Sequence, residues 1–256
     1  MKLQTQEISL SLLKEKKIRI FIKRIDKVHP FVSGNKWYKL KYNLKVAKEK
    51  GFKTLLTFGG AYSNHIIATS CAAKENSFQS IAIIRGEEQL SLNPTLSFAM
   101  ENGMELHYVS RSDYRLKHTS NFIIRLKEKF GDFYLVPEGG TNDFAIKGTA
   151  EILDTNDTQD FICCAVGTGG TIAGIINTTS DKQKVLGFPA IKGSKQLQKD
   201  IIAWSNKQNW KLINDYCCGG YAKVNEELVA FIHQFNLAHN ISLDVVYTGK
   251  MMFGIL

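Results

Sequence analysis

The chain has 256 residues, of which 44% are hydrophobic and 22% are charged. This composition is typical of one large globular domain or two smaller ones, and it excludes a disordered chain. The uninterrupted apolar runs, such as residues 161–166, are far shorter than the roughly 20 residues that cross a bilayer, so we expect no membrane span. The first 24 residues lack the apolar segment of roughly 7 to 15 residues of a secretory signal, which predicts a cytoplasmic protein.

Cysteine usage and charge narrow the class of protein further. The five cysteines include two adjacent pairs and no C-x-x-C, which predicts reduced thiols and neither a disulfide framework nor a metal site. The net charge of +9 raises the alternative of a nucleic-acid-binding protein. However, the lysines are spread along the whole chain without a recognisable motif, so a basic solvated surface and no nucleic-acid partner are expected.

The first helix in chain order is predicted to begin at Asn35, a favourable cap, after a loop over residues 29–34 that contains Pro and Gly. Its apolar residues recur every three or four positions from Trp37 to Ala47, and Gly51 ends it.

From residue 53 onward, short apolar runs alternate with amphipathic segments, the pattern of a parallel sheet with crossover helices. A first series has predicted strands at 55–58, 80–85, 105–110 and 133–136 and predicted helices at 63–75, 93–103 and 120–130. It ends at Pro137 and the following glycine turn. A second series has predicted helices at 144–153, 171–177 and 225–239 and predicted strands at 161–166 and 185–190. The sequence therefore predicts an α/β fold in two parts, divided near residue 145.

Three short segments are candidates for a functional site, and the first contains Lys36 in the first turn of the helix that begins at Asn35. The positive end of the helix dipole and any burial both favour a neutral amine, the form that a Schiff base requires. The alternative is a surface lysine that happens to follow a helix cap.

The second segment is Gly59-Gly60-Ala61-Tyr62-Ser63-Asn64-His65, in which a predicted strand runs through glycines into a helix. Such a junction lies at the carboxyl end of a parallel strand, where α/β proteins bind ligands and where backbone N–H groups attract anions. The alternative is that Ser63 and Asn64 merely cap the helix and that His65 is a hydrogen-bonded structural residue.

The third segment is the glycine loop Gly167-Thr168-Gly169-Gly170-Thr171, directly after a predicted strand. It lacks the Gly-Lys-Ser/Thr of a P-loop, and Ile172 occupies the position of the third glycine of a dinucleotide fingerprint. A monophosphate is therefore the expected ligand, the alternative being a tight strand-to-helix turn. Together the three segments meet the needs of pyridoxal 5'-phosphate, which requires aldehyde capture, ring contacts and a phosphate anchor.

The motifs SGNKWYKL, GGAYSNH, VPEGGTN, AVGTGGTIAG and VVYTGKMM, in this order, resemble the family that contains D-cysteine desulfhydrase and 1-aminocyclopropane-1-carboxylate deaminase. The resemblance extends from about residue 15 to the last residue. It implies the two-domain, three-layer αβα architecture of fold type II, tryptophan-synthase-β-like pyridoxal phosphate enzymes, and a homodimer. We expect residues 1–42 and 146–256 to form the large cofactor-binding domain and residues 43–145 the small one.

The resemblance also implies a role for individual residues. Lys36 matches the family's Schiff-base lysine and proton-transfer base, and Lys39 matches a phosphate contact one turn later. Asn64 matches the side chain that faces the cofactor ring hydroxyl, and Ser63 a hydroxyl near the substrate. With His65 these two residues are expected to hold the substrate carboxylate. The phosphate cup of the family matches the segment Gly167, Thr168, Gly169, Gly170 and Thr171. An active-site tyrosine of the family matches Tyr247.

The expected substrate is a small amino acid. The preferred substrate is D-cysteine, which would react with water to give pyruvate, ammonia and sulfide. It is preferred because His65 follows Ser63-Asn64, whereas the deaminase pattern resembles Ser-Asn-Gln. The alternative is 1-aminocyclopropane-1-carboxylate, converted to 2-oxobutyrate and ammonia. A further alternative is a pyridoxal phosphate binding protein with little turnover, because the sequence ends at Leu256 where family members continue through another strand that contacts the pyridine nitrogen.

Overall fold

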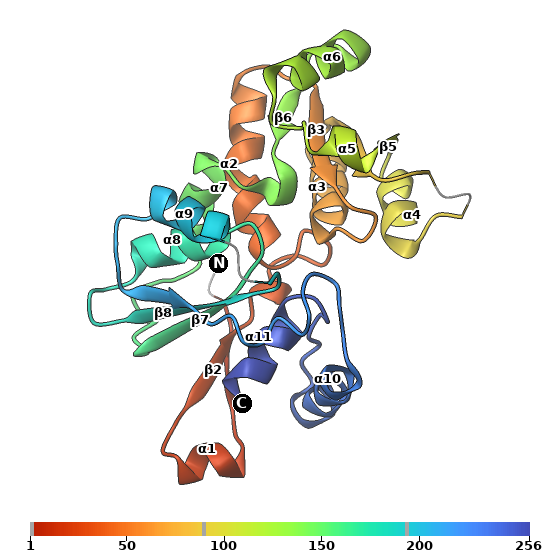
Figure 1. Ribbon diagram of the computed structural model, residues 1–256. Coiled ribbons are helices and arrows are strands. Elements are labelled where there is room, and N and C mark those ends of the chain that lie inside the picture. The colour runs from red at the N-terminus through yellow and green to blue at the C-terminus, as the bar shows by residue number, and fades with distance from the viewer. Residues whose placement is uncertain (1–2, 89–90, 193–194) are drawn as a thin grey trace. The chain divides into compact units, whose positions relative to one another are not determined.

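A computed structural model describes residues 3–88, 91–192 and 195–256 (Figure 1). The chain forms two compact units: unit 1 comprises the described residues up to Ile25 together with Thr149–Leu256, and unit 2 comprises Asp26–Gly148. The predicted domain borders at 42/43 and 145/146 differ from these, and the first of them falls inside a helix that lies wholly in unit 2. The assignment of the domains stays a prediction.

Unit 2 is built on a parallel sheet of four strands in the order β5-β4-β3-β6 (Figure 1). Its strands are β3 (Thr54–Gly59), β4 (Gln79–Arg85), β5 (Met104–Val109) and β6 (Tyr134–Val136). Its α-helices are α2 (Asn35–Glu49), α3 (Asn64–Glu75), α4 (Pro94–Glu101), α5 (Arg111–Tyr114), α6 (Ser120–Phe130) and α7 (Asp143–Thr149), the last of which ends at the border of the unit. Short 3-10 turns lie at η1 (Ile25–Lys27) and η2 (Glu138–Gly140).

Both faces of this sheet are covered, because alternate side chains of each strand point to opposite sides. Leu55 packs with residues of α2 and α3, and Ile84 packs with α3 and α4. On the other face, Leu56 and Phe58 pack with α5 and α6. Every residue of β3, including Thr54 and Thr57, is buried, so this strand runs through the interior of unit 2 to the loop that begins at Gly60.

Unit 1 contains an antiparallel hairpin and a parallel sheet in the order β7-β8-β9. The hairpin strands are β1 (Thr5–Ile8) and β2 (Ile20–Lys23), with α1 (Ser11–Glu15) at the turn between them. The sheet strands are β7 (Phe161–Val166), β8 (Lys184–Pro189) and β9 (Trp210–Leu212), and the other helices are α8 (Gly170–Thr178), α9 (Lys195–Trp204), α10 (Glu226–His239) and α11 (Thr248–Ile255). Ile8 of the hairpin is buried in a cluster with Phe235 of α10 and Met252 of α11.

The α/β class with two parallel sheets is confirmed, and α6 and β7 have the predicted bounds. The helix predicted over 144–153 is wrong at its end: α7 stops at Thr149, because Ile152 and Leu153 continue as a turn in which the Ile152 N–H donates to the Thr149 carbonyl. Among the described residues, no helix has both the length and the apolar composition of a membrane span.

Leu56→Ala tests the packing of the sheet in unit 2. Leu56 is 0% exposed and packs against α6, so removal of its side chain is expected to lower the free energy of unfolding by about 2–5 kcal/mol. Urea denaturation followed by circular dichroism measures this loss. Ile124→Ala on α6 is the control, because Ile124 is 52% exposed and its removal is expected to cost about 0.5 kcal/mol or less. Equal costs for the two variants would contradict this packing.

Candidate active site

Two lysines on the first turns of α2 point at the same backbone carbonyl. Lys36 and Lys39 are three residues apart and therefore share one face of the helix. The Nζ of Lys36 donates to the carbonyl oxygen of Gly139 at 3.3 Å, and the Nζ of Lys39 donates to the same oxygen at 3.0 Å. Lys39, which is buried, also donates to the Oγ1 of Thr141 at 2.8 Å. Hydrogen bonds from the Lys36 and Lys39 amines thus connect the start of α2 to the turn at residues 138–141.

The turn that supplies this carbonyl is a functional element to which the sequence analysis gave no role. VPEGGTN was noted only as a family motif, although Pro137 and the two glycines marked a break in structure. Gly139 and Gly140 have φ values of 66° and 72°, in the left-handed region that glycine adopts without strain. Glu138 fixes the turn from outside, because its carboxylate accepts a hydrogen bond from the Tyr114 hydroxyl at 2.8 Å and lies 3.3 Å from the Nζ of Lys117.

Burial changes the acid–base behaviour of Lys36. Desolvation lowers the pKa of its amine from 10.5 to about 8, because an ammonium loses hydration when it is enclosed by protein. A substantial fraction of the amine is therefore neutral slightly above pH 7. Only the neutral amine can attack an aldehyde or accept a proton, so this lysine is suited to both tasks.

His65, by contrast, is held as a neutral ring inside unit 2. Its side chain is 1% exposed, and its Nε2 lies 2.8 Å from the Oγ1 of Thr57. The same Thr57 hydroxyl donates to the Val136 carbonyl at 2.8 Å, and a backbone hydrogen bond to Pro137 is the contact that favours the protonated ring. Burial, followed by the positive charges of Lys36 and Lys39, keeps the pKa of His65 well below 6.5. The neutral His65 ring therefore packs against Thr57 near the carboxyl end of β3.

Ser63 and Asn64 lie at the start of α3, at the carboxyl end of β3. The Ser63 N–H donates to the Gly60 carbonyl at 3.1 Å, and the Ser63 Oγ accepts a hydrogen bond from the His65 N–H at 3.3 Å. Ser63 is thus the helix cap considered in the sequence analysis, and its side chain is still partly exposed. Asn64 is exposed, so both side chains can be reached from solvent on this face of unit 2.

The glycine loop lies in unit 1 between β7 and α8. Gly169 has a φ of 87° and precedes the first residue of α8, a helix start that no side chain caps. The carbonyl of Gly170 accepts a hydrogen bond from the buried Thr149 hydroxyl at 3.0 Å, which anchors the turn. At such a helix start, the free backbone N–H groups and the positive end of the helix dipole attract an anion. A phosphate group is an anion of this kind.

Tyr247 packs on this loop, although it is 80 positions further along the chain. A Cβ atom at Gly167 would lie only 3.0 Å from the Cε1 of Tyr247, so the ring occupies the space that any other residue at 167 would need. Asp244 holds the tyrosine backbone, because its carboxylate accepts the N–H groups of Val246 at 3.0 Å, Tyr247 at 2.8 Å and Thr248 at 3.0 Å. Tyr221, which the sequence analysis missed, packs edge-on against Tyr247 with ring centroids 6.2 Å apart.

The predicted site residues therefore form two groups. One group lies in unit 2 and consists of Lys36, Lys39 and the segment 63–65. Within it, the ring of His65 and the side chain of Lys39 both lie close to Gly140. Residues 167–171 and Tyr247 form the other group, in unit 1.

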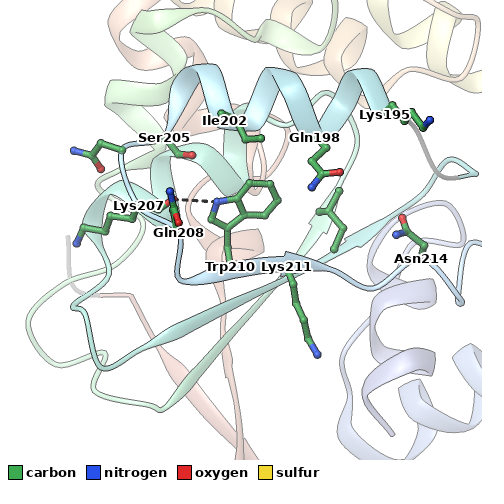
Figure 2. Close-up of a pocket in the computed structure, with 11 residues that line it drawn as sticks. Lys195, Gln198, Ile202, Ser205, Lys207, Gln208, Trp210, Lys211 and Asn214 are labelled. Atoms are coloured by element: carbon green, nitrogen blue, oxygen red, sulfur yellow. Dashed lines mark hydrogen bonds between the residues drawn. The ribbon is translucent and has the colours of Figure 1, made fainter.

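A cavity of about 690 Å³ in unit 1 lies apart from these residues, between α9 and β9 (Figure 2). Figure 2 shows the Trp210 ring beneath α9, with its Nε1–H donating to the Lys207 carbonyl at 3.1 Å. The Lys207 amine itself donates to the Thr179 carbonyl. None of the predicted site residues lines this cavity.

One cluster among the described residues has donor atoms close enough for a metal ion: His29, Cys71 and Glu75. The Nδ1 of His29 accepts the N–H groups of Phe31 at 3.2 Å and Val32 at 2.9 Å, so its Nε2 carries the proton and faces Glu75 at 3.1 Å. A metal ligand would need that Nε2 lone pair. The cluster is therefore built as a hydrogen-bonded clamp on the loop that leads into α2.

The lowered pKa of Lys36 can be measured directly. Reductive methylation with ¹³C-formaldehyde, followed by NMR at increasing pH, is expected to reveal one lysine signal with a midpoint near pH 8 that is missing from Lys36→Arg. A Lys36 midpoint near 10.5 would show that the amine is solvated as in a model peptide.

The neutral state of His65 predicts a pH dependence of stability. Below about pH 6.5 the unfolded chain protonates this histidine while the folded protein does not, so the folded state loses stability as the pH falls. The contribution approaches about 1.4 kcal/mol per pH unit. Urea unfolding at pH 7 and pH 5.5 is expected to show a steeper loss for the wild type than for His65→Asn. The same pH slope in both proteins would mean that folded His65 takes up the proton.

Comparison with known proteins places these features in a family, although no protein-family model matches the sequence. A Thermotoga maritima protein named "Putative 1-aminocyclopropane-1-carboxylate deaminase" is 31% identical over 261 residues, covering 93% of this chain and 83% of that protein. The D-cysteine desulfhydrase of Klebsiella pneumoniae (strain 342) is 26% identical over 263 residues, covering 93% of this chain and 80% of the relative.

A solved structure agrees with these sequence relatives. The crystal structure of an ACC deaminase homologue matches with a TM-score of 0.86 and 25% identity, covering 100% of this chain and 83% of that chain. The chain therefore belongs to the 1-aminocyclopropane-1-carboxylate deaminase and D-cysteine desulfhydrase family of pyridoxal phosphate enzymes with the tryptophan-synthase-β-like fold.

Proposed function

We propose that this chain binds pyridoxal 5'-phosphate and converts D-cysteine and water to pyruvate, ammonia and hydrogen sulfide. The observation that carries the proposal is the Lys36 amine, whose pKa is lowered to about 8 at the start of a helix in the same unit as the Ser63–His65 segment. Family membership supports the cofactor, because members of this family use pyridoxal phosphate.

The residues present fit this cofactor. Lys36 provides the amine that captures the aldehyde, and Asn64, exposed at the end of β3, provides an amide for the ring hydroxyl. The glycine loop provides backbone N–H groups at an uncapped helix start for the phosphate, and Thr168 and Thr171 add hydroxyls. Lys39 contributes a second positive charge, which we propose acts on the phosphate.

When bound, pyridoxal phosphate withdraws electrons from the α-carbon of an amino acid and so acidifies its α-proton. Lys36 in its neutral form accepts that proton at Nζ, and we propose that it does so once substrate has displaced it. Ser63, together with Asn64, is proposed to hold the substrate carboxylate. Tyr247 is proposed to hold a proton near the β-carbon side of the substrate, where sulfide leaves.

The second candidate reaction is the opening of 1-aminocyclopropane-1-carboxylate with water to 2-oxobutyrate and ammonia. It is supported by the names of several relatives, among them a bifunctional D-cysteine desulfhydrase/1-aminocyclopropane-1-carboxylate deaminase of Arabidopsis thaliana at 28% identity. This substrate has no α-hydrogen, so a proton must leave a ring carbon or a nucleophile must attack it, with Tyr247 or Ser63 as the acting group. His65 after Ser63-Asn64 favours D-cysteine.

The experiment compares the purified chain with two variants of the same helix, Lys36→Ala and Lys48→Ala, in the presence of pyridoxal phosphate. The wild type and Lys48→Ala are expected to show the visible absorption of lysine-bound cofactor, whereas Lys36→Ala is not, because Lys48 is exposed on the last turns of α2. Pyruvate and sulfide are assayed with D-cysteine, and 2-oxobutyrate with the cyclopropane substrate. We expect Lys36→Ala to lose at least about 10³-fold in kcat.

Each possible result of this experiment leads to a different conclusion about the function. 2-Oxobutyrate without pyruvate would replace the proposed reaction with the second candidate, and Lys36-dependent absorption without either product would leave a binding protein with little turnover. No cofactor absorption in any of the three proteins would contradict the proposal altogether. We also propose a homodimer, for which light scattering is expected to give about twice the chain mass of 28.8 kDa.

A further inference from the structure

A further buried lysine, Lys250 of α11, has no part in the proposed reaction. Its side chain is 2% exposed, and its Nζ donates to the carbonyl oxygens of Cys217 at 2.8 Å and Gly220 at 2.7 Å. A buried ammonium is costly unless it is hydrogen-bonded, so these two carbonyls are what allows the charge to be buried here. Lys250 thus ties α11 to a segment that precedes it by 30 residues.

The backbone of that segment adopts an unusual conformation. Cys218, Gly219, Gly220 and Ala222 all have positive φ, at 49°, 85°, 120° and 56°. Residues other than glycine rarely occupy this region, and such strain persists only where surrounding contacts fix the chain. The ammonium of Lys250 donates to the carbonyls of Cys217 and Gly220, which lie on either side of Cys218 and Gly219, so it fixes the first part of this segment.

The segment ends in a ring that touches the site. Tyr221 follows Gly220 directly and packs edge-on against Tyr247, with an angle of 67° between the ring planes. Tyr247 in turn fills the space above Gly167 of the glycine loop. A continuous series of contacts therefore runs from the Lys250 ammonium through Tyr221 and Tyr247 to the loop.

We propose that Lys250 is a positioning residue: its ammonium fixes the 217–220 backbone and thereby sets the orientation of the Tyr221–Tyr247 pair over the glycine loop. This inference rests on the proposed function, because it assigns to Lys250 an effect on turnover through Tyr247. The clamp itself can be tested without cofactor, substrate or activity.

The first test measures amide hydrogen exchange of residues 217–222 in the cofactor-free protein. Lys250→Met keeps the length of the side chain and removes both hydrogen bonds, so exchange in this segment is expected to be about tenfold faster or more, while β7 and β8 stay unchanged. Lys182→Met, at an exposed lysine of the same unit, is the matched control and is expected to exchange as the wild type. Unchanged exchange in Lys250→Met would overturn the proposal.

The second test is kinetic and uses the cofactor-loaded enzyme. Lys250→Met is expected to lower kcat about 10- to 100-fold with less than about threefold change in KM, because the substrate carboxylate is bound by unit 2. Tyr221→Ala is expected to lower kcat by a similar factor, and the double variant is expected to be no slower than Tyr221→Ala alone. Additive losses would show that Lys250 does not act through Tyr221, and would overturn the proposal.

Two outcomes are kept apart by this design. Faster exchange in Lys250→Met together with a wild type that turns over neither substrate would refute the proposed function, whereas the effect of Lys250 on the 217–220 backbone would stand. If Lys250→Met does not fold, Tyr221→Ala decides, because Tyr221 is 46% exposed and its removal leaves the core intact. Full kcat in Tyr221→Ala would then overturn the proposal.

Discussion

The convergence of two lysine amines on the carbonyl oxygen of Gly139 is the constraint on which the unit 2 site depends. It requires a turn that directs a carbonyl inward, and therefore two residues with positive φ, which Gly139 and Gly140 provide. Both amines donate to carbonyl or hydroxyl oxygens, whose dipoles stabilise the positive charge, and the field of that charge extends into the surrounding protein. The same field reaches His65 and helps to keep that ring neutral.

Unit 1 also contains a lysine amine that donates to backbone carbonyls, but the proposed role of this amine is different. Lys250 is also buried against backbone carbonyls, but the carbonyls belong to a strained segment whose next residue is a tyrosine. In unit 2 we propose that the amine is the reactive group, whereas in unit 1 we propose that it positions the groups around it. In both places a lysine follows closely on a helix start, so the helix fixes the Cα position and the long side chain reaches a neighbouring loop.

Local sequence patterns predicted most of the elements near the site. The start of α2 at Asn35, the buried run of β3 and the strand FICCAV before the glycine loop are signalled within ten residues, and each element formed as predicted. The prediction that Asn35 caps the helix is wrong, because Asn35 is the first helical residue and Gly34 occupies the cap position without a side-chain hydrogen bond. The short strand β9 and the hairpin β1–β2 were not predicted, because strands of three or four residues with lysines carry little periodicity. The roles of Gly139, Thr57 and Lys250 depend on residues 30 to 103 positions away. No pattern along the chain contains such pairings.

The ring of His65 has a consequence for how this sequence can diverge. The Oγ1 of Thr57 lies 2.8 Å from the Nε2 of His65, and Gly140 leaves room for the ring, since a Cβ there would lie 3.1 Å from the Cε1 of His65. A larger residue at 140 would displace the ring, and a valine at 57 would remove the hydroxyl that lies against Nε2. A replacement at position 57, 65 or 140 is therefore expected to require compensating changes at the other two positions.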